Sequence, residues 1–244
     1  IDFVHYNGFS GEYYYIETFG GGAAFFDYDN DGWLDLYLVN GTYIKGYPPD
    51  PLPVNKLYRN IGDGHFSDIT AISNLADSQY GFGVSAADYD ADGDQDLFIA
   101  NYAPNTFYRN DGTAFSELGA AIGIDDDRWG SSAGFLDYDA DGDLDLFVAN
   151  YVHFSLTDNT VCKQGKVRSY CQPDVYEPTS DLLYRNDGTA FSNITAAAGI
   201  ALKGRGLGVA FSDYDLDGDT DIYVANDGNM NFLYDNRQGY FSEV

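Results

Sequence analysis

Short runs of apolar residues, separated by polar turns rich in Asp, Asn and Gly, recur along this chain of 244 residues. In a typical case Leu146 to Ala149 follow an acidic loop and end at Asn150. Runs of this length, rich in β-branched and aromatic residues, are typical of strands, and the Asp-Gly pairs between them favour hairpin turns. The pattern therefore predicts an all-β fold.

The same pattern occurs four times. Each unit has a Gly-rich lead into a short apolar strand, an acidic loop, a second strand that ends in Asn, a third strand that also ends in Asn, and a fourth strand with Phe-Ser. We place the units at approximately residues 20–70, 81–118, 130–194 and 206–244. Four-stranded units that repeat every 40–60 residues or so predict the blades of a single β-propeller region, residues 1–244.

An acidic loop joins the first two strands of every unit. Between Asp137 and Asp145 acids stand at alternate places, and Gly142 stands at the sixth. Alternate carboxylates on a tight loop repel one another, and Ca²⁺, which takes about six to eight oxygen ligands, removes that repulsion. The likeness to an EF-hand loop is partial, since a β run follows. A solvated acidic turn is the alternative, but four copies in register favour a calcium loop between two strands.

Composition and charge limit the kinds of partner. Tyr occurs 22 times, Phe 17 times, Gly 28 times and Met once, which is a β-rich and turn-rich usage. The formal net charge of −27 argues against nucleic acid or an anionic membrane as partner, because phosphate binding needs clustered Lys and Arg. About half of the 39 acids lie in the acidic loops, so bound metal would relieve part of the self-repulsion.

The cysteines indicate the compartment in which the protein is located. Cys162 and Cys171 lie in one polar loop; two cysteines are too few for a structural zinc site, so we expect a disulfide. A disulfide together with calcium loops predicts an extracellular protein, secreted or on the cell surface. Sequons at Asn40 and Asn193 are compatible with this location. No apolar run approaches the ~20 residues of a membrane span. The chain starts at Ile1 without a signal sequence, and we expect a processed form or a fragment.

The longest interval between acidic loops contains an insertion at residues 151–180, which holds both cysteines. The insertion also carries the basic cluster Lys163, Lys166 and Arg168. We interpret it as a solvated excursion that balances charge; the alternative is a contact with a partner. Residues 1–19 contain two aromatic β-like runs.

Arginine recurs in the third strands, at Arg59, Arg109 and Arg185. We expect these side chains to stabilise carboxylates or carbonyls between blades. A functional anion site is less well supported, because the fourth unit has Asp235 at this place.

These motifs resemble the FG-GAP/VCBS repeat family, which includes the integrin α-subunit propeller. In that family the D-x-D-x-D-G-x-x-D loop between the first two strands of a blade is a calcium site, and all four loops match it. Five stretches further resemble the cartilage acidic protein/UnbV-like subgroup: Phe3–Gly8, Glu17–Thr18, Ala24–Gly32, Leu57–Asn60 and Tyr170–Pro173. Family propellers usually have seven blades, which implies that the four units belong to a larger propeller or are completed by assembly.

The resemblance also implies the calcium ligands, with one ion per loop and about four per chain. Side chains at places one, three, five and nine bind the ion, and place seven contributes its backbone carbonyl. The implied ligands are Asp27, Asp29, Asp31, Trp33 and Asp35; Asp88, Asp90, Asp92, Asp94 and Asp96; Asp137, Asp139, Asp141, Asp143 and Asp145; and Asp213, Asp215, Asp217, Asp219 and Asp221. The role of the metal is structural.

We predict a non-enzymatic, calcium-binding repeat protein that serves in cell adhesion, protein interaction or assembly. Its partner would be a protein or glycan at the cell surface, or another copy of itself. The alternative is a carbohydrate-binding propeller or, with less support, a carbohydrate-active enzyme. Against catalysis, the clustered carboxylates belong to the calcium loops, and no Gly-x-Ser-x-Gly or His-Glu-x-x-His motif occurs. The run Asp125–Asp127 is most simply a solvated turn.

Overall fold

The structure is a computed structural model, which describes residues 1–46, 48–112 and 114–244. Four sheets of four antiparallel strands follow one another along the chain, and we call them blades 1 to 4. Blade 1 contains β1 (Ala23–Phe26), β2 (Asp35–Leu38), β3 (Lys56–Asn60) and β4 (Phe66–Asp68); blade 2 contains β5 (Gly81–Ala87), β6 (Asp96–Asn101), β7 (Thr106–Asn110) and β8 (Phe115–Glu117); blade 3 contains β9 (Gly130–Leu136), β10 (Asp145–Asn150), β14 (Leu182–Asn186) and β15 (Phe191–Asn193); blade 4 contains β17 (Gly206–Ser212), β18 (Asp221–Asn226), β19 (Phe232–Arg237) and β20 (Tyr240–Glu243). The predicted all-β class with propeller-like blades is confirmed.

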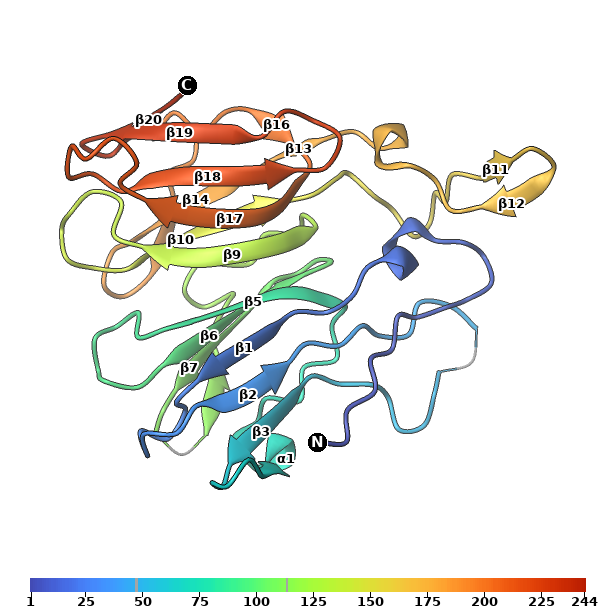
Figure 1. Cartoon of the computed structure of the whole chain (residues 1–244), viewed down its shortest axis with the longest axis horizontal. Helices are drawn as coiled ribbons and strands as arrows, with labels where there is room; N and C mark the ends of the chain where they lie inside the picture. The colour runs from blue at the N-terminus through green and yellow to red at the C-terminus, as the bar shows by residue number, and fades with distance from the viewer. Residues whose placement is uncertain (47, 113) are drawn as a thin grey trace.

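Smaller elements lie between and before the blades. They are η1 (Tyr15–Thr18), α1 (Thr70–Ser73), the hairpin β11 (Cys162–Gln164) and β12 (Val167–Ser169), η2 (Pro173–Val175), and the pair β13 (Thr179–Ser180) and β16 (Lys203–Gly204). In Figure 1 the hairpin β11–β12 projects away from the blades. No helix among the described residues is long and apolar enough to cross a membrane.

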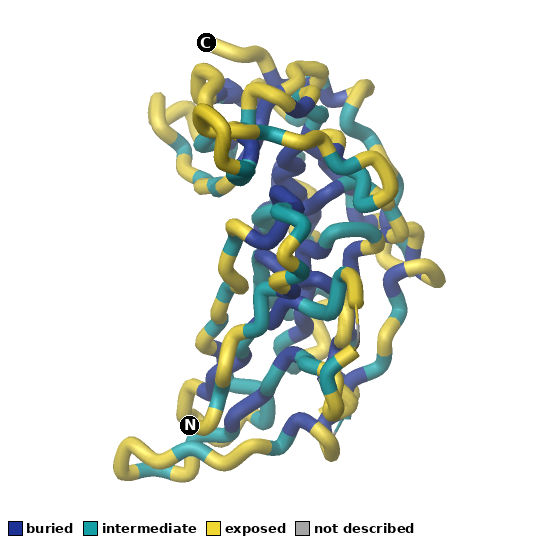
Figure 2. The backbone as a smooth tube through the Cα atoms, turned by 90° about the vertical axis from the view of Figure 1, so that its right-hand side faces the viewer, coloured by how far each residue is buried: buried dark blue, intermediate teal, exposed yellow. Residues whose placement is uncertain are grey.

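Each blade packs on its neighbours through the alternation of side chains along its strands. In β10, Phe147 and Ala149 belong to the core cluster that contains Ile222 of blade 4, whereas Leu146 and Val148 belong to the cluster that contains residues of blade 2. Successive strand residues point to opposite faces, so a middle blade needs apolar residues on both faces of its second strand, as at Leu146–Ala149 of β10. All six positions of β10 are buried accordingly. Figure 2 shows the resulting band of buried backbone through the interior of the blades.

The four blades form a row in which the first strands β1, β5, β9 and β17 lie side by side in that order (Figure 1). The outer faces of the first and last blades are much less covered than the inner ones. Tyr223 of β18 is 41% exposed, whereas Phe98 and Phe147 at the same repeat position are fully buried. At the other end of the row Phe25 of β1 is 63% exposed. These two faces carry side chains at the positions that pack between blades elsewhere in the row. Among the described residues, no further blade covers either face.

The N-terminal segment is part of the core. The sequence predicted β-like runs within residues 1–19, but the structure has the 3₁₀-helix η1 there and no strand. Tyr15 stacks on Tyr176, with ring centroids 4.9 Å apart. Its hydroxyl also forms a hydrogen bond of 2.7 Å with the hydroxyl of Tyr151. The segment therefore fills an aromatic cluster that joins it to blade 3 and to the insertion.

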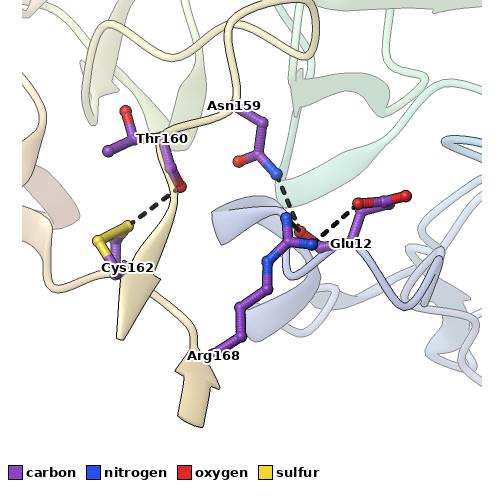
Figure 3. Close-up of a disulfide and its surroundings, with 6 residues drawn as sticks. Glu12, Asn159, Thr160, Cys162 and Arg168 are labelled. Atoms are coloured by element: carbon purple, nitrogen blue, oxygen red, sulfur yellow. Dashed lines mark hydrogen bonds and ion pairs between the residues drawn. A yellow bond between two sulfur atoms is a disulfide. The ribbon is translucent and has the colours of Figure 1, made fainter. Parts of the chain in front are cut away.

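The insertion is tied to that segment. Arg168 donates a hydrogen bond of 3.0 Å from Nη1 to the carboxylate of Glu12, and Asn159 donates one of 2.9 Å to the Glu12 carbonyl (Figure 3). The predicted disulfide between Cys162 and Cys171 is present, with Cα atoms 5.1 Å apart. The interpretation that the basic cluster balances charge agrees with Arg168, whose partner is an acid of the same chain.

Candidate metal centres

The four acidic loops share one backbone conformation. In the loop of blade 3, Asp137 accepts hydrogen bonds from the backbone N–H groups of Asp141 (3.2 Å) and Gly142 (3.1 Å). The other loops repeat this arrangement. Gly142 has a φ of 97° and Ala140, at the fourth place, one of 59°, so the chain turns sharply at both places. The first carboxylate thus organises its own loop through contacts within six residues.

This turn gathers the acidic side chains of each loop. Three carboxylates in every loop have oxygens within 4.8 Å of one another, and they come from places one, three and five in blade 1 and from places one, three and nine in blades 2 to 4. The members are Asp27, Asp29 and Asp31; Asp88, Asp90 and Asp96; Asp137, Asp139 and Asp145; and Asp213, Asp215 and Asp221. All twelve clustered residues are among the predicted calcium ligands. The ninth-place acid of blade 1, the fifth-place acids of blades 2 to 4 and the seventh-place residues of all four loops are not members of these clusters.

The aspartate at the ninth place is buried in every loop and connects the loop to its sheet. In blade 3, Asp145 accepts hydrogen bonds from the backbone N–H of Tyr138 (3.1 Å) and from that of Asn186 in β14 (2.8 Å). Burial raises the pKa of Asp145 to about 7, and that of Asp96 in blade 2 to about 7 as well. The same cause raises the pKa of Asp35 in blade 1. A buried carboxylate of this kind favours a cation beside it.

An asparagine at or next to the end of the third strand links neighbouring loops in blades 2 to 4. Asn186 of blade 3 donates from Nδ2 to the carbonyl of Tyr89 in the loop of blade 2 (2.9 Å). Asn236 of blade 4 bonds the carbonyl of Tyr138 in the same way (2.8 Å). Sequence reasoning assigned no role to these residues, although their recurrence at the end of the third strand was the available signal. The loops of blades 1 to 3 are therefore each held by the blade that follows.

The recurring arginines act within a blade. Arg59 contacts Asp29 (2.7 Å) and Asp31 (2.9 Å) of the loop in its own blade. Arg109 instead pairs with Asp111 in the turn after its strand, at 2.8 Å. Arg185 pairs likewise with Asp187 (2.8 Å). The expectation that these arginines act between blades is therefore wrong, because the nearest carboxylates lie on the adjoining loop and turn.

The donor set of the loops suits a hard divalent cation. Every gathered ligand atom is a carboxylate oxygen, the type of ligand that Ca²⁺ prefers. Asp29 Oδ1 and Asp139 Oδ1, both at the third place, are buried and have no hydrogen-bond donor among the described residues. Buried carboxylate oxygens are normally paired, so these two atoms fit a site in which a cation is the partner.

Comparisons with known proteins agree with the repeat pattern. The family model described as FG-GAP-like repeat matches residues 27–99 and 88–148, each of which spans two consecutive acidic loops. No curated protein matches the chain. One similar solved structure is that of an Agrocybe aegerita lectin that recognises non-reducing terminal N-acetylglucosamine, with 16% identity and a TM-score of 0.47. The match covers 89% of this chain and 49% of the lectin chain, so this chain spans about half the length of that protein.

Proposed function

Because this chain belongs to the FG-GAP-like repeat family, we propose that it is a calcium-stabilised propeller module that binds another protein and catalyses no reaction. The observation that carries the proposal is the fourfold gathering of carboxylates at one end of the blades. A chain with a formal net charge of −27 needs a cation to bring such groups together without strong repulsion. Calcium would supply that charge at each loop and would stabilise the folded state over the unfolded one.

The loops contribute rigidity to the whole row of blades. Place one orders the turn, place nine fixes the turn to the third strand, and the asparagine of the next blade bonds the loop carbonyl. A cation bound by places one, three and nine would therefore stabilise two blades at once. The narrower likeness to the cartilage acidic protein/UnbV-like subgroup stays a prediction, as does the place-seven carbonyl as a ligand.

The same features support an extracellular setting. The disulfide Cys162–Cys171 is favoured outside the reducing cytosol, and calcium at millimolar levels would keep such loops occupied. We infer adhesion or assembly as the role, because the outer faces of blades 1 and 4 expose aromatic side chains such as Phe25 and Tyr223.

Calorimetric unfolding tests the calcium proposal. The melting temperature is measured in calcium and in EGTA, with metal content determined on the same sample. We expect about four ions per chain and a stabilisation of up to about 4 kcal/mol per site when calcium is at a thousandfold excess over Kd. Asp139→Asn should reduce both quantities, whereas Asp127→Asn, an exposed acid outside the loops, should change neither. A protein that binds no metal and melts at the same temperature in EGTA would have plain acidic turns.

Carbohydrate binding is the second candidate, and one cleft supports it. The cleft, of about 770 Å³, lies between the connections of blades 2, 3 and 4. Its lining includes the packed aromatic residues Tyr102, Trp129 and Phe154, and charged side chains of both signs such as Asp127 and Lys203. Apolar walls with a few polar groups are usual for small-ligand sites, and hydroxyl groups can pair with acids and cations alike.

A glycan array with the calcium-loaded protein tests this second candidate. Binding to a neutral oligosaccharide should weaken in Lys203→Ala and persist in Lys166→Ala, a change of an exposed lysine in the insertion. An array without a hit removes the carbohydrate candidate and leaves the protein-interaction proposal in place.

A further inference from the structure

The residue that precedes the asparagine near the end of the third strand is an arginine in blades 1 to 3 and an aspartate in blade 4. It is Arg59 in blade 1, Arg109 and Arg185 in blades 2 and 3, and Asp235 in blade 4. In every blade the next residue, the asparagine, donates its backbone N–H to the ninth-place aspartate at 2.8 Å. The four side chains therefore start from the same position beside the acidic loop, although one of them has the opposite charge.

In blade 1 the arginine binds the acids of the loop itself. Arg59 Nη2 lies 2.7 Å from Asp29 and 2.9 Å from Asp31, at the third and fifth places. This loop also has Trp33 at the place where the other loops have an additional Asp. The loop of blade 1 thus offers a cation fewer acids than the other loops do. Two of these acids are also already paired with Arg59.

In blades 2 and 3 the arginine is turned toward an acid of its own. Arg109 donates from Nε to Asp111 at 2.9 Å, and Arg185 donates to Asp187 at 2.8 Å. In blade 1 the corresponding residue is Ile61, which offers no such partner. The loops of blades 2 and 3 keep all their acids free of an ion pair among the described residues.

Blade 4 has the same ion pair with its two residues exchanged. Asp235 stands at the arginine position, and Arg237, two residues later, donates to it from Nε at 2.9 Å. The Asp235 side chain is 4% exposed and the Arg237 side chain 73%, so the acid lies inside and the base outside. Asp235 Oδ1 is buried without a hydrogen-bond donor among the described residues. The exchange places an additional buried carboxylate at the loop of blade 4.

We propose that the four loops bind calcium with graded affinity, tightest in blade 4 and weakest in blade 1, and that Asp235 and Arg59 set these two ends. The inference rests on the proposed calcium function. Calcium affinity rises with the number of negative charges around the ion. One unit charge several ångströms from a divalent ion changes affinity about tenfold even in a water-like medium.

Trp33 provides a reporter for the weakest site. It is one of two tryptophans, lies in the loop of blade 1 and is 55% exposed, whereas Trp129 is 2% exposed in the aromatic cluster. The calcium-loaded protein is titrated with a chelator, and bound calcium and tryptophan fluorescence are followed together. The Trp33 fluorescence should change as the first calcium ion is released. In Asp215→Asn, a variant of the blade 4 loop, the calcium ion that is released last should be missing.

Charge variants test the weakest site, in blade 1, and the tightest site, in blade 4, separately. Arg59→Gln should shift the Trp33 transition to about tenfold lower free calcium. The double change Asp235→Arg with Arg237→Asp, which gives blade 4 the order of blades 2 and 3, should weaken the tightest ion about tenfold. The reverse exchange in blade 2, Arg109→Asp with Asp111→Arg, is the matched control and should leave the Trp33 transition unchanged.

The outcomes distinguish this inference from the function on which it rests. Four ions released in one step, or a Trp33 transition that accompanies the last ion, would overturn the grading while calcium binding stands. An unchanged Trp33 transition in Arg59→Gln would show that Arg59 does not set the calcium affinity of the blade 1 loop. This conclusion would hold even if the blade 4 variant did not fold. Absence of any bound calcium would overturn the proposed function itself.

Discussion

The hydroxyl of Tyr170 donates a hydrogen bond of 2.7 Å to the carboxylate of Glu17, a residue 153 positions earlier in the chain. Glu17 is 3% exposed, and its carboxylate also accepts hydrogen bonds from the backbone N–H and the hydroxyl of Ser10. This contact, with that of Arg168 to Glu12, holds the insertion on the segment that precedes blade 1. A buried carboxylate is thus the point at which two irregular stretches of the chain meet.

Removal of this donor should destabilise the fold. Tyr170→Phe leaves the buried Glu17 carboxylate with one hydrogen bond fewer, and we expect the free energy of unfolding to fall by about 1.5–3 kcal/mol, as for bonds to charged groups. Denaturant unfolding in saturating calcium measures the change. Tyr240→Phe, at a tyrosine that is 56% exposed, is the control and should change stability little. Equal losses in the two variants would contradict the role of Glu17.

Loss of the disulfide should loosen the insertion without unfolding the blades. The bond between Cys162 and Cys171 closes a short loop, with a sequence separation of 9, and chain entropy gives about 2–3 kcal/mol for a loop of this size. In Cys162→Ser with Cys171→Ser we expect faster tryptic cleavage after Lys163 and Lys166, both exposed. Cleavage is followed by mass spectrometry beside the calcium-dependent melting transition. Unchanged cleavage would mean that the contacts to Glu12 suffice to order the insertion.

Stability should depend on pH through Asp181, which occupies a place that asparagine fills in the other blades. Its Oδ1 accepts the backbone N–H of Asn150 at 2.9 Å, as Asn105 accepts that of Asn101 in blade 2. Burial raises the pKa of Asp181 from 3.8 to about 7. The native state then holds a proton that the unfolded state has lost, so this contribution is complete below pH 3.8 and is lost as the pH rises to about 7.

Asp181→Asn should therefore be more stable than the unchanged protein above pH 7, by a few kcal/mol at ~1.4 kcal/mol per pKa unit, and the difference should vanish below pH 4 or so. Melting temperatures across this pH range give the test. Asn105→Asp is the matched control in blade 2 and should create the opposite dependence. A difference between Asp181→Asn and the unchanged protein that is the same at every pH would exclude titration of this carboxyl as its cause.

Because the outer face of blade 4 is uncovered, we expect substitutions at equivalent repeat positions to differ in their cost in stability. Phe147→Ala removes a fully buried ring between blades 3 and 4 and should cost about 3–5 kcal/mol. Tyr223→Ala, at the same repeat position in blade 4, removes a ring that is 41% exposed and should cost clearly less. Denaturant unfolding at several protein concentrations compares the two. A cost for Tyr223→Ala as large as that for Phe147→Ala would show that this face is covered in solution.

Much of the local structure follows from the sequence. The acidic loops could be placed because their first carboxylate bonds N–H groups only four and five residues away, as Asp137 does with Asp141 and Gly142. The strands could be placed because the apolar runs are bounded by Asp-Gly turns. The sequence did not reveal the bond from Asn186 to the Tyr89 carbonyl, which spans 97 residues and depends on how blades 2 and 3 pack.

The sequence by itself determined the all-β class, the fourfold repeat and the position of every acidic loop, because these depend on residues close together in the chain. Only the tertiary structure decided that η1 enters the aromatic cluster, that Arg168 meets Glu12, and that Tyr223 stays exposed while Phe147 is buried. Burial and ion pairing depend on which surfaces approach one another, and the same repeat position has a neighbouring blade in one unit and none in another.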